Sequence, residues 1–218
     1  PAPLARPKAP KAYQTEATKA LADDQVRALL RVVKAKADAG DLVGKRDYAL
    51  LLFYLARGWR RREVIGLRWG DVQLSDGGLA VTARLKGGEV VTRHLDDPRV
   101  KAALLDYLTA SGRLAGMTAE TPLWVSHDRR RAAGAALTSH GFVKNLKAYA
   151  AQAGIGPIHL HQTRHTFARW VAEETGSLTE TQEALGHKNL ATTRVYVARV
   201  TTQPDKHSRR ILDRLGVA

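Results

Sequence analysis

Five short segments of the sequence carry side chains that could bind an anion, transfer a proton or attack an electrophile. In chain order they are Gly58-Trp59-Arg60-Arg61-Arg62-Glu63-Val64, Lys86-Gly87-Gly88, His161-Gln162-Thr163-Arg164-His165, Leu185-Gly186-His187 and Thr192-Thr193-Arg194-Val195-Tyr196. Guanidinium groups bind anionic oxygens through paired hydrogen bonds. Histidine and lysine exchange protons, and a tyrosine phenol can act as a nucleophile.

Taken singly, most of these residues also have an ordinary structural explanation. A run such as Arg60–Arg62 is most often a solvated helix face, and a lone tyrosine is most often a core residue. His161 and His165 are four residues apart, so they share a helical face and could hold zinc. However, Gln162 replaces the glutamate of the metalloprotease pattern, and no further ligand follows at suitable spacing. We therefore expect neither a metal ion nor a cofactor.

Taken together, the order and spacing of the five segments resemble those of the tyrosine recombinase (phage integrase) family. That family carries an Arg, a hairpin Lys, a His-x-x-Arg-His motif, a Leu-Gly-His motif and a Tyr nine residues after the last His. The resemblance covers about residues 21–200. It implies a mainly α-helical catalytic domain with a small antiparallel β-sheet. It also implies site-specific DNA recombination or integration, as in mobile elements, through a 3′-phosphotyrosyl intermediate.

The resemblance assigns roles around a scissile phosphate. Arg60 and Arg164 would clamp its non-bridging oxygens, and His187 would add one more donor to them. Such groups stabilise the negative charge that develops in the transition state. Tyr196 would be the nucleophile, with His161 as its proton acceptor, because a free phenol has a pKa of about 10.

Other residues would support this chemistry. Lys86 on a hairpin would protonate the departing 5′ oxygen. Glu63, three residues after the first arginine of the family pattern, would orient the cations of the site. His165 would have a supporting role, with packing as its main function.

A run of three arginines outside the motifs is a candidate for phosphate contacts in DNA binding. It consists of Arg129, Arg130 and Arg131. Such a run can equally lie in solvent. If it contacts phosphates, the affinity for DNA should fall steeply as the salt concentration rises.

Two departures from the family pattern leave its catalytic groups in place. Thr163 stands where Leu is common, and Arg61 and Arg62 replace an apolar-polar pair. A type IB topoisomerase-like enzyme is an alternative with a similar residue set, but the tight motif spacing favours the recombinase. A non-catalytic DNA-binding relative would lack Tyr196 or an arginine. A metal-dependent transposase is disfavoured because no carboxylate triad is apparent.

The domain organisation follows from composition and from the resemblance. Residues 1–20 hold four prolines and several basic residues, which predicts an extended linker. Residues 21–218 form the catalytic domain. The family usually places a helical domain of about 100 residues ahead of it, sized like a small separate domain. This chain is therefore either an excised catalytic domain or an unusually short relative, and the linker-like composition of residues 1–20 favours excision. The segment at about 203–218 either docks on a neighbouring subunit of a tetramer on DNA or packs on its own domain.

Hydrophobic periodicity predicts the elements that position these residues. A helix begins at Asp24, capped by Asp23 and stopped by Gly40, and another is capped by Ser139. A β-branched hairpin surrounds Lys86, and 123–125 is a candidate third strand. The helices are predicted over 24–40, 46–56, 62–67, 100–108, 142–150, 162–173, 178–185 and 205–215.

Composition favours a nucleic-acid partner. The chain has 218 residues, 44% of them hydrophobic, with 35 Lys and Arg against 21 Asp and Glu, so its net charge is +14. Such basicity is typical of domains that bind nucleic acids, which the resemblance narrows to double-stranded DNA, although acidic proteins or lipids also attract basic chains.

The longest apolar stretch, Tyr48–Ala56, is too short to cross a membrane. The lack of cysteine fits a reducing compartment, so we expect a cytoplasmic protein, nucleoid-associated if prokaryotic.

Overall fold

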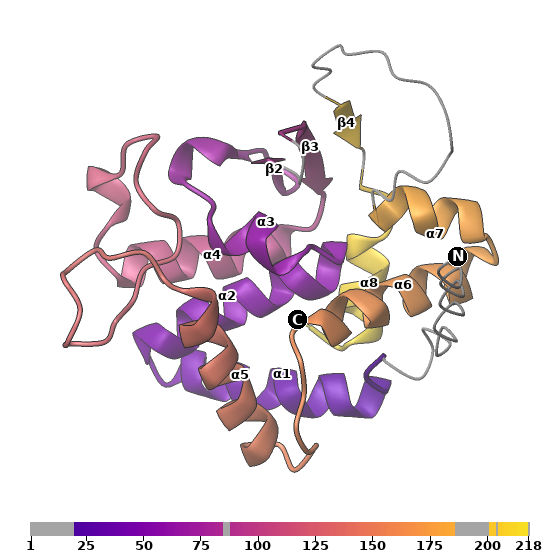
Figure 1. Cartoon of the computed structure of the whole chain (residues 1–218), viewed down its shortest axis with the longest axis horizontal. Coiled ribbons are helices and arrows are strands. Elements are labelled where there is room, and N and C mark those ends of the chain that lie inside the picture. The colour runs from indigo at the N-terminus through magenta and orange to yellow at the C-terminus, as the bar shows by residue number, and fades with distance from the viewer. Residues whose placement is uncertain (1–19, 85–87, 186–200, 204, 218) are drawn as a thin grey trace, which may run out of the picture.

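Helix α2 (Leu42–Arg57) forms the centre of the fold in the computed structural model, which describes residues 20–84, 88–185, 201–203 and 205–217 (Figure 1). Nearly all of its residues are buried, and the run Ala49–Ala56 is almost without exposure. A helix that is apolar on every side must be surrounded by other elements. The side chain of Asp41 caps its start by accepting a hydrogen bond from the Val43 amide (3.0 Å).

The other helices pack around α2 and confirm the predicted mainly helical fold. They are α1 (Asp23–Asp38), α3 (Arg61–Ile65), α4 (Pro98–Ala110), α5 (Ser139–Gln152), α6 (His161–Thr175), α7 (Leu178–Leu185) and α8 (Ser208–Arg214), with short 3-10 helices at Trp69–Asp71 (η2) and Leu114–Gly116 (η3). Helices α1, α4, α6 and α8 all contact α2. None of the described helices has the length and apolarity that a membrane crossing needs.

Two predicted helix caps are wrong by one residue. Asp23 is the first residue of α1, and Ala22 occupies the cap position. Ser139 is likewise the first residue of α5, and Thr138 caps that helix by accepting a hydrogen bond from the Gly141 amide (3.1 Å). The Asp23 carboxylate is engaged in tertiary contacts, which explains why it does not cap its own helix.

A small sheet contains the predicted hairpin. Its strands are β1 (Val72–Leu74), β2 (Leu79–Arg84), β3 (Val90–Leu95) and β4 (Thr201–Gln203), in that spatial order. The first three are antiparallel, with Thr82 opposite Thr92, which confirms the expected antiparallel sheet. Strand β4 adds a parallel pairing in which Gln203 lies opposite Arg93. The sequence analysis does not predict this strand.

The candidate third strand at 123–125 is wrong. This segment makes only isolated bridges, with Arg68 opposite Pro122 and Val125 opposite Ala136. Leu123, Trp124 and Val125 are all buried, so the run fills the core, and the Trp124 indole donates to the Val64 carbonyl (2.9 Å). The third antiparallel strand is β1.

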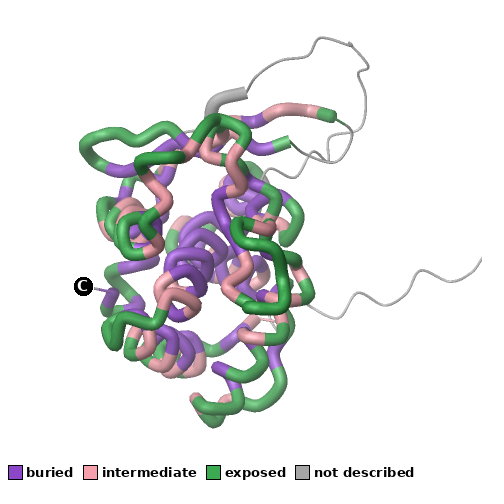
Figure 2. The backbone as a smooth tube through the Cα atoms, turned by 90° about the vertical axis from the view of Figure 1, so that its left-hand side faces the viewer, coloured by how far each residue is buried: buried purple, intermediate pink, exposed green. Residues whose placement is uncertain are grey.

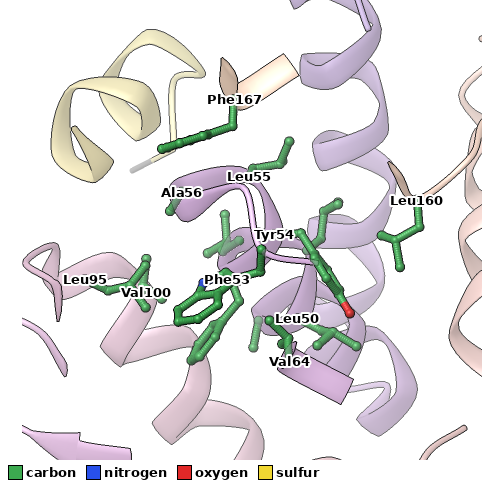
Figure 3. Close-up of a cluster of buried hydrophobic side chains, with 14 of the residues drawn as sticks. Leu50, Phe53, Tyr54, Leu55, Ala56, Val64, Leu95, Val100, Leu160 and Phe167 are labelled. Atoms are coloured by element: carbon green, nitrogen blue, oxygen red, sulfur yellow. The ribbon is translucent and has the colours of Figure 1, made fainter. Parts of the chain in front are cut away.

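One hydrophobic core joins α1 to α8. Buried residues gather in the middle of the chain trace and exposed ones form its outer turns (Figure 2). Phe167 of α6 and Leu160 approach the side chains of α2 from different sides, and Leu95 and Val100 approach from another (Figure 3). Ile211, Leu212 and Leu215 are buried as well. In this single chain the apolar face of α8 therefore packs on its own domain.

Asp23 ties the first helix to two later ones. Its carboxylate accepts hydrogen bonds from the Trp170 indole (2.7 Å), from Arg169 (2.5 Å) and from Arg214 (2.8 Å). Burial alone would raise the pKa of Asp23. The hydrogen bonds from these three residues and the charge of Arg169 outweigh it and lower the pKa to about 2. The ionised carboxylate therefore stabilises the folded state.

We expect Asp23→Asn to lower the free energy of unfolding at pH 7 by about 2 kcal/mol. The depressed pKa means that this contribution is complete above pH ~4 and is lost as the pH falls toward 2. Urea unfolding of parent and variant between pH 7 and 2 measures the difference. Asp24→Asn, at an exposed neighbour, is the control and should change little. A difference that stays constant over this pH range would contradict the assignment.

Candidate active site

Gly58 directs the chain from the end of α2 into the site. It adopts the left-handed conformation with φ of 59°, and its amide donates to the Tyr54 carbonyl (3.0 Å), which ends the helix. A Cβ atom at this position would lie 2.4 Å from Cδ1 of Phe167. Both the backbone and the packing therefore require glycine. The turn buries Trp59 and brings Arg60 to the start of α3.

Arg60 is held by Glu63 through two hydrogen bonds. The Arg60 amide donates to Oε2 of Glu63 (2.8 Å), and Nη1 of the same arginine donates to Oε1 (2.9 Å). The Glu63 side chain is only 4% exposed, whereas that of Arg60 is 42% exposed. The carboxylate thus fixes a guanidinium group that still reaches the surface. This geometry suits the orienting role expected for Glu63, which stays a prediction.

Arg164 joins the ends of two helices from inside the core. It lies in the first turn of α6 and is buried. Its Nη1 donates to the Gly58 carbonyl (2.5 Å) and its Nη2 to the Leu185 carbonyl (2.9 Å). Carbonyl groups at helix C-termini carry partial negative charge, which favours a cation there. Arg164 is therefore fixed next to the turn that carries Arg60.

Arg93 is a buried cation of this site that the sequence analysis missed. Its side chain is 0% exposed, and its guanidinium carbon lies 4.7 Å from the centroid of the Trp59 ring. Nη1 lies 3.8 Å from Oε2 of Glu63, and Nη2 donates to the Leu185 carbonyl (3.4 Å). The signal was available, because alternation along β3 places Arg93 on the inward side between Val91 and Leu95.

Burial lowers the pKa of Arg93 but leaves its side chain protonated. Burial lowers the pKa of Arg93 to about 10, although the Glu63 carboxylate opposes the shift. Arg57, at the end of α2, also has a pKa lowered by burial, with Asp205 and Asp96 acting in the opposite direction. Both groups remain charged at neutral pH. We call Arg57, Arg60, Arg93 and Arg164 the arginine cluster, with Glu63 as the carboxylate among them.

Two histidines lie on α6 beside Arg164. The rings of His161 and His165 are edge to face with centroids 4.7 Å apart. His161 is exposed and His165 is half-buried. The helix therefore presents an exposed imidazole close to a buried arginine, which suits proton exchange with a bound group. In the described part of the chain, no three His, Asp or Glu side chains gather in a way that could hold a metal ion.

The structure leaves part of the expected site untested. Lys86, His187 and Tyr196 lie outside the described residues. The elements that flank them are described, because β2 and β3 frame Lys86 and Leu185 precedes His187 by two positions. The roles of these three residues therefore stay predictions.

The predicted DNA-binding run lies away from this site. Arg129, Arg130 and Arg131 are all exposed, in the loop between η3 and α5 (Figure 1). Asp128 shapes the turn that carries them, because its carboxylate accepts from the Arg130 amide (3.0 Å) and its carbonyl from the Arg131 amide (2.9 Å). The structure does not bring these three arginines together with the arginine cluster, and their contact with DNA stays a prediction.

Sequence comparisons connect this chain with known proteins. The model of the phage integrase family matches residues 19–202. The chain is 34% identical over 195 residues to tyrosine recombinase XerC of Xanthomonas campestris pv. campestris (strain B100), covering 89% of this chain and 55% of the relative. It is 33% identical over 168 residues to tyrosine recombinase XerD of Lacticaseibacillus casei, covering 74% and 53%. The chain thus spans about half the length of the curated relatives it matches.

Solved structures show the same fold. The XerH site-specific recombinase bound to difH substrate, in a pre-cleavage complex, superposes with a TM-score of 0.64 at 22% identity. That match covers 78% of this chain and 47% of the other chain. The XerA recombinase superposes with a TM-score of 0.60 at 23% identity, covering 78% and 56%. At these identities the likeness concerns the fold.

Glu63 should matter more to stability than an exposed carboxylate does. Glu63→Gln keeps the shape but leaves the buried Arg93 cation without its charge partner, so we expect a loss of about 3 kcal/mol in unfolding free energy. Glu120→Gln is the matched control, because its ion pair with Arg68 is exposed and should contribute less than ~1 kcal/mol. Urea unfolding at pH 7 measures both. Equal losses would show that Glu63 does not hold a buried charge.

Proposed function

Because this chain belongs to the phage integrase family, we propose that it is the catalytic domain of a site-specific DNA recombinase or integrase. It would cleave and rejoin DNA strands through a 3′-phosphotyrosyl link to Tyr196. The single observation that carries the proposal is the position of Arg164. Its guanidinium is hydrogen-bonded to Gly58, two residues before Arg60, so two family arginines from segments about 100 residues apart converge.

Electrostatics support a phosphodiester as the substrate. The arginine cluster holds four guanidinium groups with the Glu63 carboxylate among them, while Asp96 and Asp205 act on Arg57 and Glu89 acts on Arg93 from outside the cluster. Attack on a phosphodiester adds charge to non-bridging oxygens, which preorganised cations stabilise. Arg60 is exposed enough to meet such a group, and Arg164 lies behind the same turn. No step of this chemistry calls for a metal ion or a cofactor.

The environments of the other tyrosines support Tyr196 as the nucleophile. Burial raises the pKa of the Tyr48 phenol to about 12 and raises the pKa values of the Tyr54, Tyr107 and Tyr149 phenols as well. Such phenols are poor sources of a phenolate. These four are the tyrosines in the described ranges, and the chain has six. Besides Tyr196 only Tyr13 remains, and it precedes the family match.

The remaining roles complete the proposed reaction. His161 accepts the phenolic proton, and Lys86 protonates the 5′ oxygen as it leaves. His187 donates to a non-bridging oxygen. His165 supports its neighbours on α6, in keeping with its edge-to-face contact with His161.

The proposed partners are double-stranded DNA and further copies of the chain. The exposed run Arg129, Arg130 and Arg131 and the net charge of +14 would add phosphate contacts. Strand exchange would use a tetramer on DNA. Because Ile211, Leu212 and Leu215 pack on their own domain in the single chain, docking of the segment 203–218 on a neighbouring subunit would require this apolar face to exchange between copies. The proposed location is the cytoplasm, on the nucleoid if the host is prokaryotic. The type IB topoisomerase alternative is not favoured, because the similar proteins reported above are recombinases.

Covalent capture tests the nucleophile. Fragments of DNA from around the gene are incubated with the protein, adducts are mapped, and the mapped site is built into a nicked suicide duplex. We expect an adduct that survives SDS, and Tyr196→Phe should bind this duplex yet form none, because it lacks the phenolic oxygen. Tyr13→Phe is the control and should react normally. An adduct with Tyr196→Phe would mean that another residue attacks the phosphorus.

A bridging sulfur tests Lys86 as the general acid. Losing a proton donor typically costs ~10²–10⁴ in rate. We expect Lys86→Ala to show such a loss on the normal duplex and to recover on a duplex with sulfur at the bridging 5′ position, because a thiolate leaves without a proton. Arg164→Ala should stay slow on both, since its role concerns non-bridging oxygens. Equal slowness of Lys86→Ala on both duplexes would make Lys86 a positioning residue. Single-turnover cleavage is the measurement.

A further inference from the structure

We propose that Arg93 is a positioning residue of this site, whose buried charge offsets Glu63 so that Arg60 keeps its full electrostatic effect on the scissile phosphate. The inference rests on the proposed function and adds to it a residue from the sheet. The Arg93 side chain is 0% exposed, so it cannot contact the substrate. Arg93 therefore acts through its neighbours.

The Glu63 carboxylate has two opposing effects on Arg60. This carboxylate orients Arg60 through hydrogen bonds of 2.8 and 2.9 Å. An ion pair of that kind carries no net charge, so the group that orients the cation also cancels much of its field at the substrate. A second cation close to the same carboxylate offsets this loss. Nη1 of Arg93 lies 3.8 Å from Oε2 of Glu63 and restores a net positive charge.

Three contacts from different elements fix the position of this second cation. The Trp59 ring lies against the guanidinium at 4.7 Å, Glu63 faces Nη1, and the Leu185 carbonyl accepts from Nη2 (3.4 Å). Arg164 donates to the same Leu185 carbonyl (2.9 Å). Arg93 thus contacts the residue that precedes Arg60, the carboxylate that orients Arg60, and the backbone group shared with Arg164.

A comparison with Arg46 separates this role from ordinary packing. Arg46 is also buried, and it bonds Asp47 through Nε (2.8 Å) and Nη2 (2.7 Å) and the Val125 carbonyl through Nη1 (2.8 Å). Arg93, by contrast, has buried Nε and Nη1 atoms without a hydrogen-bond partner among the described residues. Unpaired buried donors destabilise a fold. An arginine whose role is to stabilise the fold would have hydrogen-bond partners for these donors. We therefore assign the role of Arg93 to its charge.

A neutral phosphate analogue tests the inference. Two suicide duplexes carry the mapped site, one with a normal phosphodiester and one with a methylphosphonate, in which a methyl group replaces a charged non-bridging oxygen. Single-turnover cleavage at saturating DNA is measured for the parent, Arg93→Met and Arg93→Lys. Arg113→Met is the matched control for loss of a structural arginine, because that guanidinium donates to the Leu123 carbonyl (3.3 Å).

We expect Arg93→Met to be slower than the parent by roughly 10- to 100-fold on the phosphodiester. On the methylphosphonate the rate loss of Arg93→Met should shrink to a few-fold. The reason is that less negative charge develops on the non-bridging positions of this neutral group in the transition state. Arg93→Lys keeps the charge and should stay within a few-fold of the parent on both. Arg113→Met should show the same ratio between the two duplexes as the parent. Should Arg93→Met not fold, Arg93→Gln takes its place.

The outcomes separate this inference from the function on which it rests. If the parent forms no Tyr196-dependent adduct on the phosphodiester, the proposed function fails and the inference fails with it. If the parent cleaves and Arg93→Met loses the same factor on both duplexes, the role of Arg93 alone is refuted. A loss in Arg93→Lys as large as that in Arg93→Met also refutes it, because the charge would then be irrelevant.

Discussion

The site depends on one buried guanidinium that bonds two backbone carbonyls. Arg164 connects Gly58, where α2 ends, to Leu185, where α7 ends, through hydrogen bonds of 2.5 and 2.9 Å. A neutral side chain could pack there, but it could not offset the partial negative charges at the C-terminal ends of two helices. Because α2 is the centre of the core, this contact fixes the turn that carries Arg60 relative to a deeply buried helix.

The fold also concentrates like charges in its interior. Arg57, Arg93 and Arg164 are buried, and Glu63 is the carboxylate that lies among them and Arg60. Such an arrangement repels itself and costs stability, which the apolar contacts around α2 must offset. A site that costs stability in this way is typical of chemistry on anions. The domain is a stable helical body that supports a locally unfavourable positive cluster.

Much of the fold could be predicted from the sequence, and the reasons differ by element. Helix α7 (Leu178–Leu185) has the predicted bounds, and the hairpin follows from β-branched runs around glycines. Strands β1 and β4 have three residues each and carry no local signal, since their pairing depends on partners far along the chain. The motif arginines were predictable from order and spacing. The inward position of Arg93 could also be inferred from the alternation along β3, but its contacts with Trp59 and Glu63 could not, because these partners come from another segment of the chain.

The parallel pairing of β4 has a consequence for chain entropy. The side chain of Arg93 bonds Leu185, and its backbone position lies opposite Gln203 in β4. Leu185 and strand β4 are therefore both held beside β3. Pairing β4 with β3 closes the chain between Val91 and Thr201, and the entropy lost in closing so long a loop is only slightly larger than that lost in closing a short one.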